Sequence, residues 1–501
     1  MRPSYSLPDH RAQARGRWHG PWEARGDDLS RAIIRMSTEA NERDTYMRYI
    51  STRGGTPPMG FADAVLTGLA PDGGLLLPER LPDLSGRLRA LAELSYVDLA
   101  ETLIAEFADD IPRADLHRIV QEAYASFDHP EVTPLVRLSR EHVLELFHGP
   151  TLAFKDVALQ FLGRVFEYLL AARGEQLNIL GATSGDTGSA AIAGVRGRDR
   201  IRIFIMYPHE RTSRLQELQM ISVLDANVHN LAVRGSFDDC QAIMKEIFND
   251  LPFKQRYQLG AVNSVNWARV LAQVVYYFYA GLRVGGPTTF SVPTGNFGDI
   301  FAGYLAARMG LPVARLVLAT NENDILSVFF NTGAYRRGSV HQTISPSMDI
   351  QVASNFERFL FYRFDGDAAR VRGFLDEFQR TGEARIDDGR PIDDLIVATT
   401  VGTDETLQTI ARVQNEEGYL LDPHTAVGVA AARRLGMPAP VVCLATAHPA
   451  KFPEAIGRVL DPALARHPRL TALESLPTRR TVIDASIDEV KRFLSAAVDA
   501  E

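Results

Sequence analysis

The sequence predicts an α/β fold built on a mostly parallel sheet with helices on both faces. Short, continuous apolar runs recur along the chain, and most are followed by a loop and then a segment of helical character. Strands that are buried on both faces read as continuous apolar runs, and their alternation with helices is typical of parallel sheets. The expected strands cover residues 177–182, 201–208, 228–235, 288–293, 315–321, 395–400 and 440–448.

Composition narrows the class of protein. The chain has 501 residues, of which 46% are hydrophobic and 23% charged, as in ordinary soluble proteins of several domains. A net charge of −8 argues against nucleic-acid binding, which needs a basic face. The most apolar stretch, 270–284, is too short to cross a membrane. Cys240 and Cys443 are too few for a disulfide framework or a zinc site, so we expect no metal and a reducing cytoplasm.

The first 46 residues differ from the rest. They contain eight arginines, no lysine and seven acidic residues, with little periodicity. Targeting peptides are poor in acidic residues, so a disordered extension is the better interpretation. From Met47 the sequence is turn-rich and then helical to about residue 127.

Three loops follow expected strands, and in such sheets ligands bind where these loops gather. The first, "GATSGDTGSAA" at 181–191, opens into a helix and predicts an anion site, although it could be only a tight turn. It contains the Asp-Thr-Gly signature of aspartic proteases. That chemistry needs two such aspartates on an all-β fold, and the helix expected after Gly188 argues against it.

The other two loops are "VPTGNFGDI" at 292–300 and "CLATAHPAKFPEAI" at 443–456. In the first, Gly295 and Gly298 allow close approach of the backbone to a phosphate. In the second, Thr446 ends a strand, where its hydroxyl could bind a ligand or cap the next helix.

Lys155 follows an apolar turn in "HGPTLAFKDVAL" and begins a predicted helix. A helix N-terminus disfavours a cation, so an apolar setting there favours the neutral amine, which can attack a carbonyl. Solvent exposure is the alternative. Together, a nucleophilic lysine, a phosphate-binding loop and a hydroxyl for a ring nitrogen predict pyridoxal 5'-phosphate as the cofactor.

The motifs "LFHGPTLAFKD", "GATSGDTGSAA", "NSVNWAR", "PTGNFGD", "DPHTAVG" and "ATAHPAKF" resemble the bacterial and yeast branch of the threonine synthases. The resemblance covers about residues 47–460. It implies a fold-type II pyridoxal phosphate enzyme with two α/β subdomains and a smaller, mainly helical N-terminal domain. The implied regions are 47–130, a catalytic region at 131–470 and a C-terminal segment at 471–501.

The resemblance also implies the chemistry: a carbon–oxygen lyase that converts O-phospho-L-homoserine and water to L-threonine and phosphate. It makes Lys155 the Schiff-base lysine and catalytic base. The residues that it implies at the cofactor are Asp186, Gly295, Asn296, Phe297, Gly298, Asp299 and Thr446. Those implied at the substrate carboxylate are Thr183, Ser184 and Thr187. The substrate phosphate needs cations, for which Arg269 and Lys451 are the candidates, with solvent exposure of both as the alternative.

Several alternatives stay open at this level. A phospho-lyase that releases 2-oxobutyrate from the same substrate would share every motif. A β-replacement enzyme like the tryptophan synthase β-chain is disfavoured by "LAFKD" and "ATAHPAKF", and a pseudoenzyme by the intact lysine and loops. The expected partner is a small molecule, with no nucleic acid or membrane, and the expected state is a monomer or homodimer.

Overall fold

The computed structural model describes residues 46–183, 185–438 and 440–500. The chain divides into two units, Met1–Tyr46 and Met47–Glu501, and all elements described belong to the second. The extension predicted at 1–46 therefore lies outside the described residues except for Tyr46. Within the described ranges, no helix combines the length and apolar character that a bilayer span requires.

The N-terminal part of the second unit is mainly helical, as expected. A short antiparallel pair of strands, β1 and β2, precedes a group of helices, of which α5 packs on α6 and α4 on α11. Ser95 caps α4 by accepting a hydrogen bond from the backbone N–H of Asp98 at 3.2 Å. The bounds are β1 Tyr49–Ser51, β2 Leu76–Pro78, α2 Phe61–Thr67, α3 Leu88–Ala92, α4 Tyr96–Ala105, α5 Arg113–Tyr124, α6 Lys155–Arg173 and α11 Trp267–Val284.

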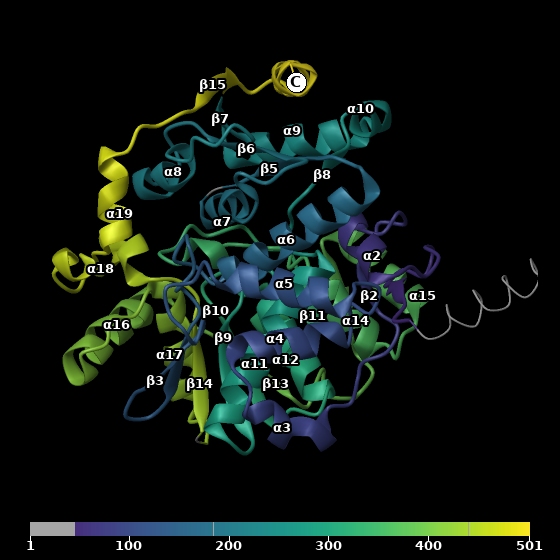
Figure 1. Cartoon of the computed structure of the whole chain (residues 1–501). Helices are drawn as coiled ribbons and strands as arrows, with labels where there is room; N and C mark the ends of the chain where they lie inside the picture. The colour runs from purple at the N-terminus through teal and green to yellow at the C-terminus, as the bar shows by residue number, and fades with distance from the viewer. Residues whose placement is uncertain (1–45, 184, 439, 501) are drawn as a thin grey trace, which may run out of the picture. The chain divides into compact units, whose positions relative to one another are not determined.

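A five-stranded parallel sheet has the order β15-β7-β6-β5-β8. Alternate residues of β6 point to opposite faces: Ile203 and Ile205 share a core with α7, whereas Phe204 and Met206 pack with α9. Figure 1 shows α9 and α7 on the two sides of this sheet. The bounds are β5 Leu177–Ala182, β6 Ile201–Pro208, β7 Val228–Arg234, β8 Leu259–Gly260, β15 Thr481–Asp484, α7 Asp186–Val195 and α9 Phe237–Asn249.

The second large sheet has six strands in the order β13-β10-β9-β14-β4-β3, and only β3 is antiparallel to its neighbour. Leu316 and Leu318 of β10 face the core that contains α11 and α12, and Val317 and Ala319 face α17. The bounds are β3 Leu135–Arg137, β4 His142–Glu145, β9 Thr288–Pro293, β10 Val313–Thr320, β13 Ile396–Thr400, β14 Val441–Ala445, α12 Gly298–Arg308, α16 Thr403–Glu417 and α17 Pro423–Leu435.

These two sheets confirm the fold class, and all seven expected strands form. The expected strand 440–448 ends earlier, at Ala445, because the following residues pair with the loop before α6 instead, through a bridge between Ala447 and Ala153. The remaining elements are α8 Arg214–Ile221, α10 Leu251–Arg256, α13 Ile325–Thr332, α14 Phe356–Arg363, α15 Ala368–Thr381, α18 Pro453–Ile456, α19 Pro468–Ala472, α20 Ile487–Asp499, and the antiparallel pair β11 Ala334–Arg336 and β12 Glu383–Arg385.

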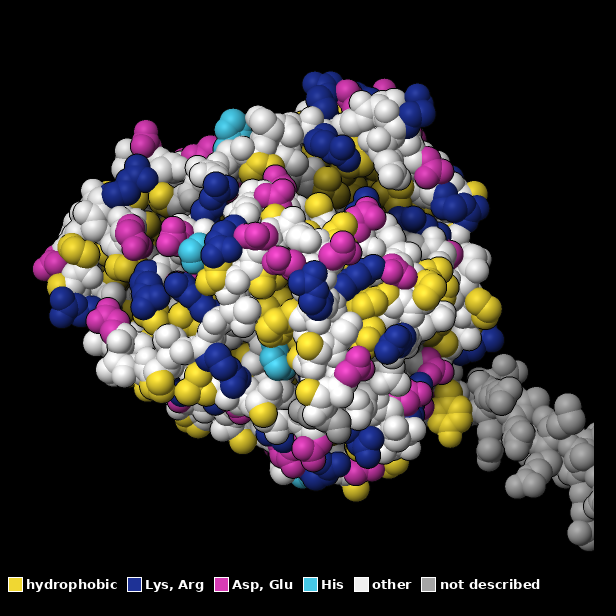
Figure 2. All heavy atoms as spheres, turned by 90° about the horizontal axis from the view of Figure 1, so that it is seen from above, with side chains coloured by type: hydrophobic (Ala, Val, Ile, Leu, Met, Phe, Trp, Pro, Cys, Tyr) yellow, Lys and Arg dark blue, Asp and Glu magenta, His cyan; other side chains and the backbone are white. Residues whose placement is uncertain are grey.

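The C-terminal segment completes the five-stranded sheet. Strand β15 pairs with β7, and Val490 and Leu494 of α20 are fully buried in the core that contains α9. This segment was expected only as an unassigned C-terminal region. Figure 2 shows one face of the molecule, on which basic and acidic side chains are interspersed.

Candidate functional site

A cavity of about 160 Å³ lies beyond the carboxyl ends of β9 and β14, where the fold class predicts a ligand. It brings together most of the residues expected from the sequence, although they come from distant parts of the chain. Its lining includes Lys155, Thr187, Arg269, Gly295, Asn296, Phe297, Gly298, Asp299 and Thr446, together with Phe154, Ser264, Gln273, Pro293, Thr294, Ser347 and Met348.

Lys155 is held in this cavity by the loop after β14. The backbone N–H of Phe154 donates to the carbonyl of Thr446 at 2.8 Å, and that of His448 donates to Leu152 at 3.0 Å. Leu152 adopts a left-handed conformation with φ 59°, which bends the chain into α6. The nucleophile and the expected ring-nitrogen partner are thus fixed to each other by backbone hydrogen bonds.

Lys155 is half-buried as a residue, and its amine has a lowered pKa of about 8. Burial is the main cause, because it penalises the ammonium form, and the cations Lys451 and Arg269 act in the same direction. The carboxylates Asp186 and Asp156 oppose the shift. A neutral amine is therefore available near neutral pH.

This pKa gives a direct test on the cofactor-free chain. Amine reagents such as acetic anhydride react with the unprotonated form, so Lys155 should reach half its maximal labelling rate near pH 8, about two units below an ordinary lysine. Labelling is measured by peptide mass spectrometry over pH 6–11, with the exposed Lys245 as internal reference. A midpoint above about pH 10 would contradict a desolvated amine.

The loop between β9 and α12 has the geometry of a phosphate cradle. A Cβ atom at Gly295 would lie 2.6 Å from the carbonyl oxygen of Ser347, so only glycine fits there. Phe297, with φ 65°, precedes α12, and its buried ring stacks on Phe330 at 5.9 Å. The packing of the Phe297 ring therefore fixes the start of α12, where the first backbone N–H groups of a helix have no partner within the helix.

Two of the side chains expected at the phosphate already have hydrogen-bond partners within the protein. Asp299 accepts hydrogen bonds from Tyr276 at 2.6 Å and Tyr277 at 2.9 Å through Oδ1. Burial raises its pKa to about 6. Asn296 accepts from Ser354 at 3.1 Å through its side-chain oxygen. For Asp299, which would carry a repelling charge, the contribution expected toward a phosphate is therefore its backbone N–H.

Arg269 is one of the two cations expected at the substrate phosphate. It lies in the first turn of α11, is 3% exposed, and lines the cavity. Among the described residues, its Nε and Nη1 have no hydrogen-bond partner, although both are buried. Burial lowers its pKa to about 10. Unpaired buried donors are costly, so they favour an anion as the missing partner of this guanidinium.

Lys451, the second cation expected at the substrate phosphate, is placed differently. Its buried ammonium donates to the carbonyl of Thr151 at 2.7 Å and to Gln219 at 2.8 Å, and it pairs with Asp186 at 2.9 Å. An ammonium has three donors, so all are used. This geometry does not favour the phosphate role, and Lys451 is instead the counter-ion of Asp186.

Asp186 is not among the residues that line the cavity. Burial opposes ionisation of its carboxyl group, but attraction to Lys451 and Lys155 outweighs it and lowers the pKa. Its Oδ1 also accepts from the side-chain amide of Gln216 at 3.1 Å. The expected contact with the cofactor stays a prediction.

The hydroxyl residues of the first glycine loop divide into two roles. Thr183 Oγ1 accepts from the backbone N–H groups of Gly185 and Gly188, both at 3.0 Å, so it stabilises the turn into α7 rather than facing the cavity. Thr187 lines the cavity and keeps its predicted role toward the substrate carboxylate. Ser184 lies outside the described residues.

Sequence reasoning assigned no role to Ser347 or His424. Ser347 follows the strands in a segment without periodicity, so nothing local marked it. His424 lies in "DPHTAVG", one of the motifs that resemble the family. The charged Asp422 two residues earlier was the sequence signal that could have marked His424 as a functional residue. In the structure His424 contacts Ser347, and Ser347 lines the cavity.

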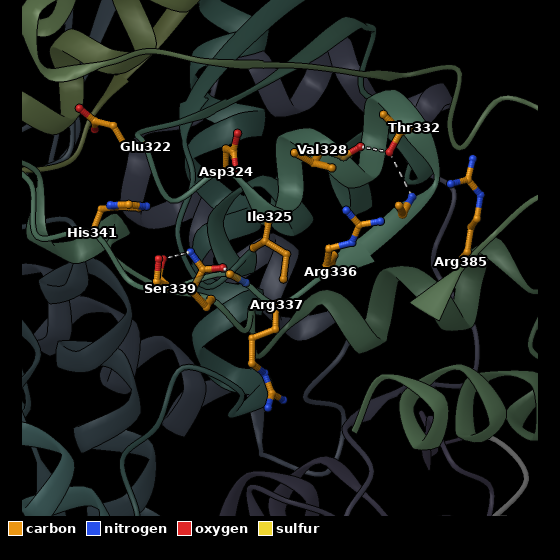
Figure 3. A pocket seen from close by; sticks show the side chains of 13 residues that line it. Glu322, Asp324, Ile325, Val328, Thr332, Arg336, Arg337, Ser339, His341 and Arg385 are labelled. Carbon is orange, nitrogen blue, oxygen red and sulfur yellow. Dashed lines mark hydrogen bonds between the residues drawn. The ribbon is translucent and has the colours of Figure 1, made fainter. Parts of the chain in front are cut away.

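A larger cavity of about 510 Å³ lies elsewhere, and none of the expected residues line it. Figure 3 shows Glu322, Asp324 and His341 at one end and Arg336 and Arg385 at the other. Arg336 is already paired with Glu383 at 2.8 Å on the surface. The residues expected to bind and react with a ligand therefore lie at the smaller cavity.

Comparisons with known proteins identify the family of the chain. Family models match at residues 48–124 (threonine synthase N terminus), 127–377 (pyridoxal-phosphate dependent enzyme) and 425–494 (threonine synthase, C-terminal), so the likeness extends beyond the expected limit of 460. A threonine synthase of Pseudomonas aeruginosa is 49% identical over 90% of this chain and 98% of its own length.

Two solved structures are similar over nearly their whole length. The structure of pyridoxal-phosphate-bound threonine synthase from Brucella melitensis has a TM-score of 0.87 and 48% identity, and covers 90% of this chain and 99% of its own. That of yeast threonine synthase has a TM-score of 0.86 and 40% identity, and covers 91% and 99%. The chain therefore belongs to the threonine synthase family, within the pyridoxal-phosphate dependent enzymes.

Proposed function

We propose that the chain is a threonine synthase, which converts O-phospho-L-homoserine and water to L-threonine and phosphate. One observation carries the proposal: Lys155, the N-terminus of α12 and Arg269, two of whose buried donors have no partner among the described residues, line one cavity. An amine with a lowered pKa and two phosphate-binding groups are the functions that such a reaction needs.

The residues present fit pyridoxal phosphate. The cradle at Gly295 and the backbone N–H groups at the start of α12 suit the phosphate group of the cofactor. Lys155 suits its aldehyde, and the Thr446 hydroxyl suits its ring nitrogen. When bound, this cofactor supplies an electron sink that stabilises negative charge on the substrate.

The protein's own groups then supply binding and proton transfer. The Lys155 amine, neutral above about pH 8, takes the proton from Cα of the substrate, and its position near Thr446 keeps it at the cavity. Thr187 is the proposed hydroxyl donor to the substrate carboxylate. Arg269 is proposed to bind the substrate phosphate, which leaves from Cγ before water adds at Cβ.

Product analysis in ¹⁸O-water tests the function. The loaded chain should form threonine and phosphate in equal amounts, with one ¹⁸O in the threonine hydroxyl and none in phosphate, because the carbon–oxygen bond breaks. A phosphatase would place ¹⁸O in phosphate and release homoserine. Release of 2-oxobutyrate as the main product would favour the phospho-lyase instead. Arg336→Met, at the other cavity, is the matched control and should behave as the unchanged chain.

Three further expectations belong to this proposal. We expect a small-molecule substrate without a nucleic-acid partner, in line with the net charge of −8. We expect a monomer or homodimer. Two buried cysteines, both free, suit a reducing cytoplasm.

A further inference from the structure

Ser347 lies where three parts of the site meet. Its hydroxyl accepts a hydrogen bond from Lys155 Nζ at 3.4 Å, its backbone N–H donates to His424 Nε2 at 3.2 Å, and its carbonyl oxygen faces Gly295 of the phosphate cradle. The bond to Lys155 is long, as catalytic hydrogen bonds often are before a ligand binds.

The contacts of His424 define its protonation. Because Nε2 accepts from the N–H of Ser347, the ring proton is on Nδ1, which then donates to Asp422 Oδ1 at 2.9 Å. Both side chains are buried, at 4% and 0% exposure. Asp422 is itself fixed, since it caps α17 by accepting from the backbone N–H groups of His424 and Thr425.

The residues around Ser347, from 343 to 349, are also held by hydrogen bonds that do not involve His424. Asp349 accepts hydrogen bonds from Thr343, Asn321 and Asn323, and Ser345 is bonded to Asn321 at 3.0 Å. Ser347 is therefore held on one side by this network and on the other by the Asp422–His424 pair, and only its hydroxyl is directed to the lysine.

We propose that Asp422 and His424 are positioning residues that hold Ser347 so that its hydroxyl orients the amine of Lys155 in the cavity. The proposal rests on the proposed function for the use of that amine, but its geometry belongs to the protein alone. No contact of Asp422 or His424 with the cofactor or substrate is needed, because both act through Ser347.

The test measures the pH midpoint of Lys155 labelling in the cofactor-free chain. A hydroxyl that accepts from the ammonium stabilises the charged form, so Ser347→Ala should lower the midpoint by roughly half a unit. The charged neighbours Asp186, Asp156, Lys451 and Arg269 remain in the variant, and so does Asp299, which lines the same cavity. In the loaded enzyme, kcat should fall more than KM rises.

Two substitutions at His424 separate positioning from general damage. His424→Asn keeps a group for Asp422 but is too short to accept from Ser347, so the midpoint should move as in Ser347→Ala. His424→Gln can present an oxygen near the position of Nε2, so its midpoint should return most of the way to the wild-type value. Ser339→Ala, at the larger cavity and outside this network, should leave the midpoint unchanged.

The outcomes are distinct. An unchanged midpoint in Ser347→Ala, or an equal shift in Ser339→Ala, would overturn the proposal, and so would a His424→Asn variant without a shift. Borohydride reduction of the loaded wild-type chain tests the proposed function separately, because it should attach the cofactor to Lys155. If borohydride failed to attach the cofactor while the midpoints moved as expected, the positioning role of Asp422 and His424 would be supported and the proposed function would not.

Discussion

Lys155→Ala is expected to abolish threonine formation, with a fall in kcat of more than about 10³-fold. The same amine is needed to hold the cofactor covalently and to move the α-proton, and no other lysine of the described chain lines the cavity. The cradle at Gly295 and the N-terminus of α12 remain, so the variant should still bind pyridoxal phosphate, but reversibly.

Lys155→Arg is the matched control for this result. A guanidinium group keeps the positive charge but does not lose its proton in proteins, so it should be as inactive as alanine. Spectra of dialysed samples check the cofactor, and threonine assays check turnover. Near-normal threonine production by either variant would show that Lys155 is not the catalytic amine.

The second large effect is expected on stability, at the buried pair of Lys451 and Asp186. Their side chains are 0% and 4% exposed, with 2.9 Å between the charged atoms. Removing one partner leaves the other charge buried and uncompensated, so Lys451→Met should lower the free energy of unfolding by about 3–5 kcal/mol. Asp186→Asn should cost a similar amount. Urea denaturation of the cofactor-free chain measures both.

The double variant and a surface pair provide the controls. Asp186→Asn with Lys451→Met leaves no buried charge at the pair, so it should recover most of the loss. Arg336→Met breaks an exposed pair with Glu383, whose side chains are 66% and 39% exposed, and should cost below about 1 kcal/mol. A loss of that size at Lys451 would contradict its role as a structural counter-ion.

The order of strands and helices could be predicted from the local sequence. Strands β5, β6 and β9 have the bounds that were predicted, because a continuous apolar run between glycine- or proline-rich loops leaves few alternatives. Short strands such as β3 and β15 carried no comparable signal. Strand β15 forms because β7 presents a sheet edge to it, and the partner lies some 250 residues earlier in the chain.

The site shows the same division. Lys155, the loop at Gly295 and Thr446 were found from residue type and position at strand ends, since parallel strands bring their carboxyl ends to one edge. The partners of each side chain were decided only in the folded protein. Lys451 resembled a phosphate ligand, but packing places the buried carboxylate of Asp186 beside it.

By itself, the sequence determined the fold class through its apolar periodicity and the family through its motifs, and it predicted Lys155 as the catalytic lysine, because these are local properties of the chain. The tertiary structure decided that Lys451 neutralises Asp186, that Arg269 lines the cavity while two of its donors stay unpaired among the described residues, and that Ser347 joins His424 to Lys155. The physical reason is that pairing energies depend on distance and burial, which chain folding sets among residues far apart in sequence.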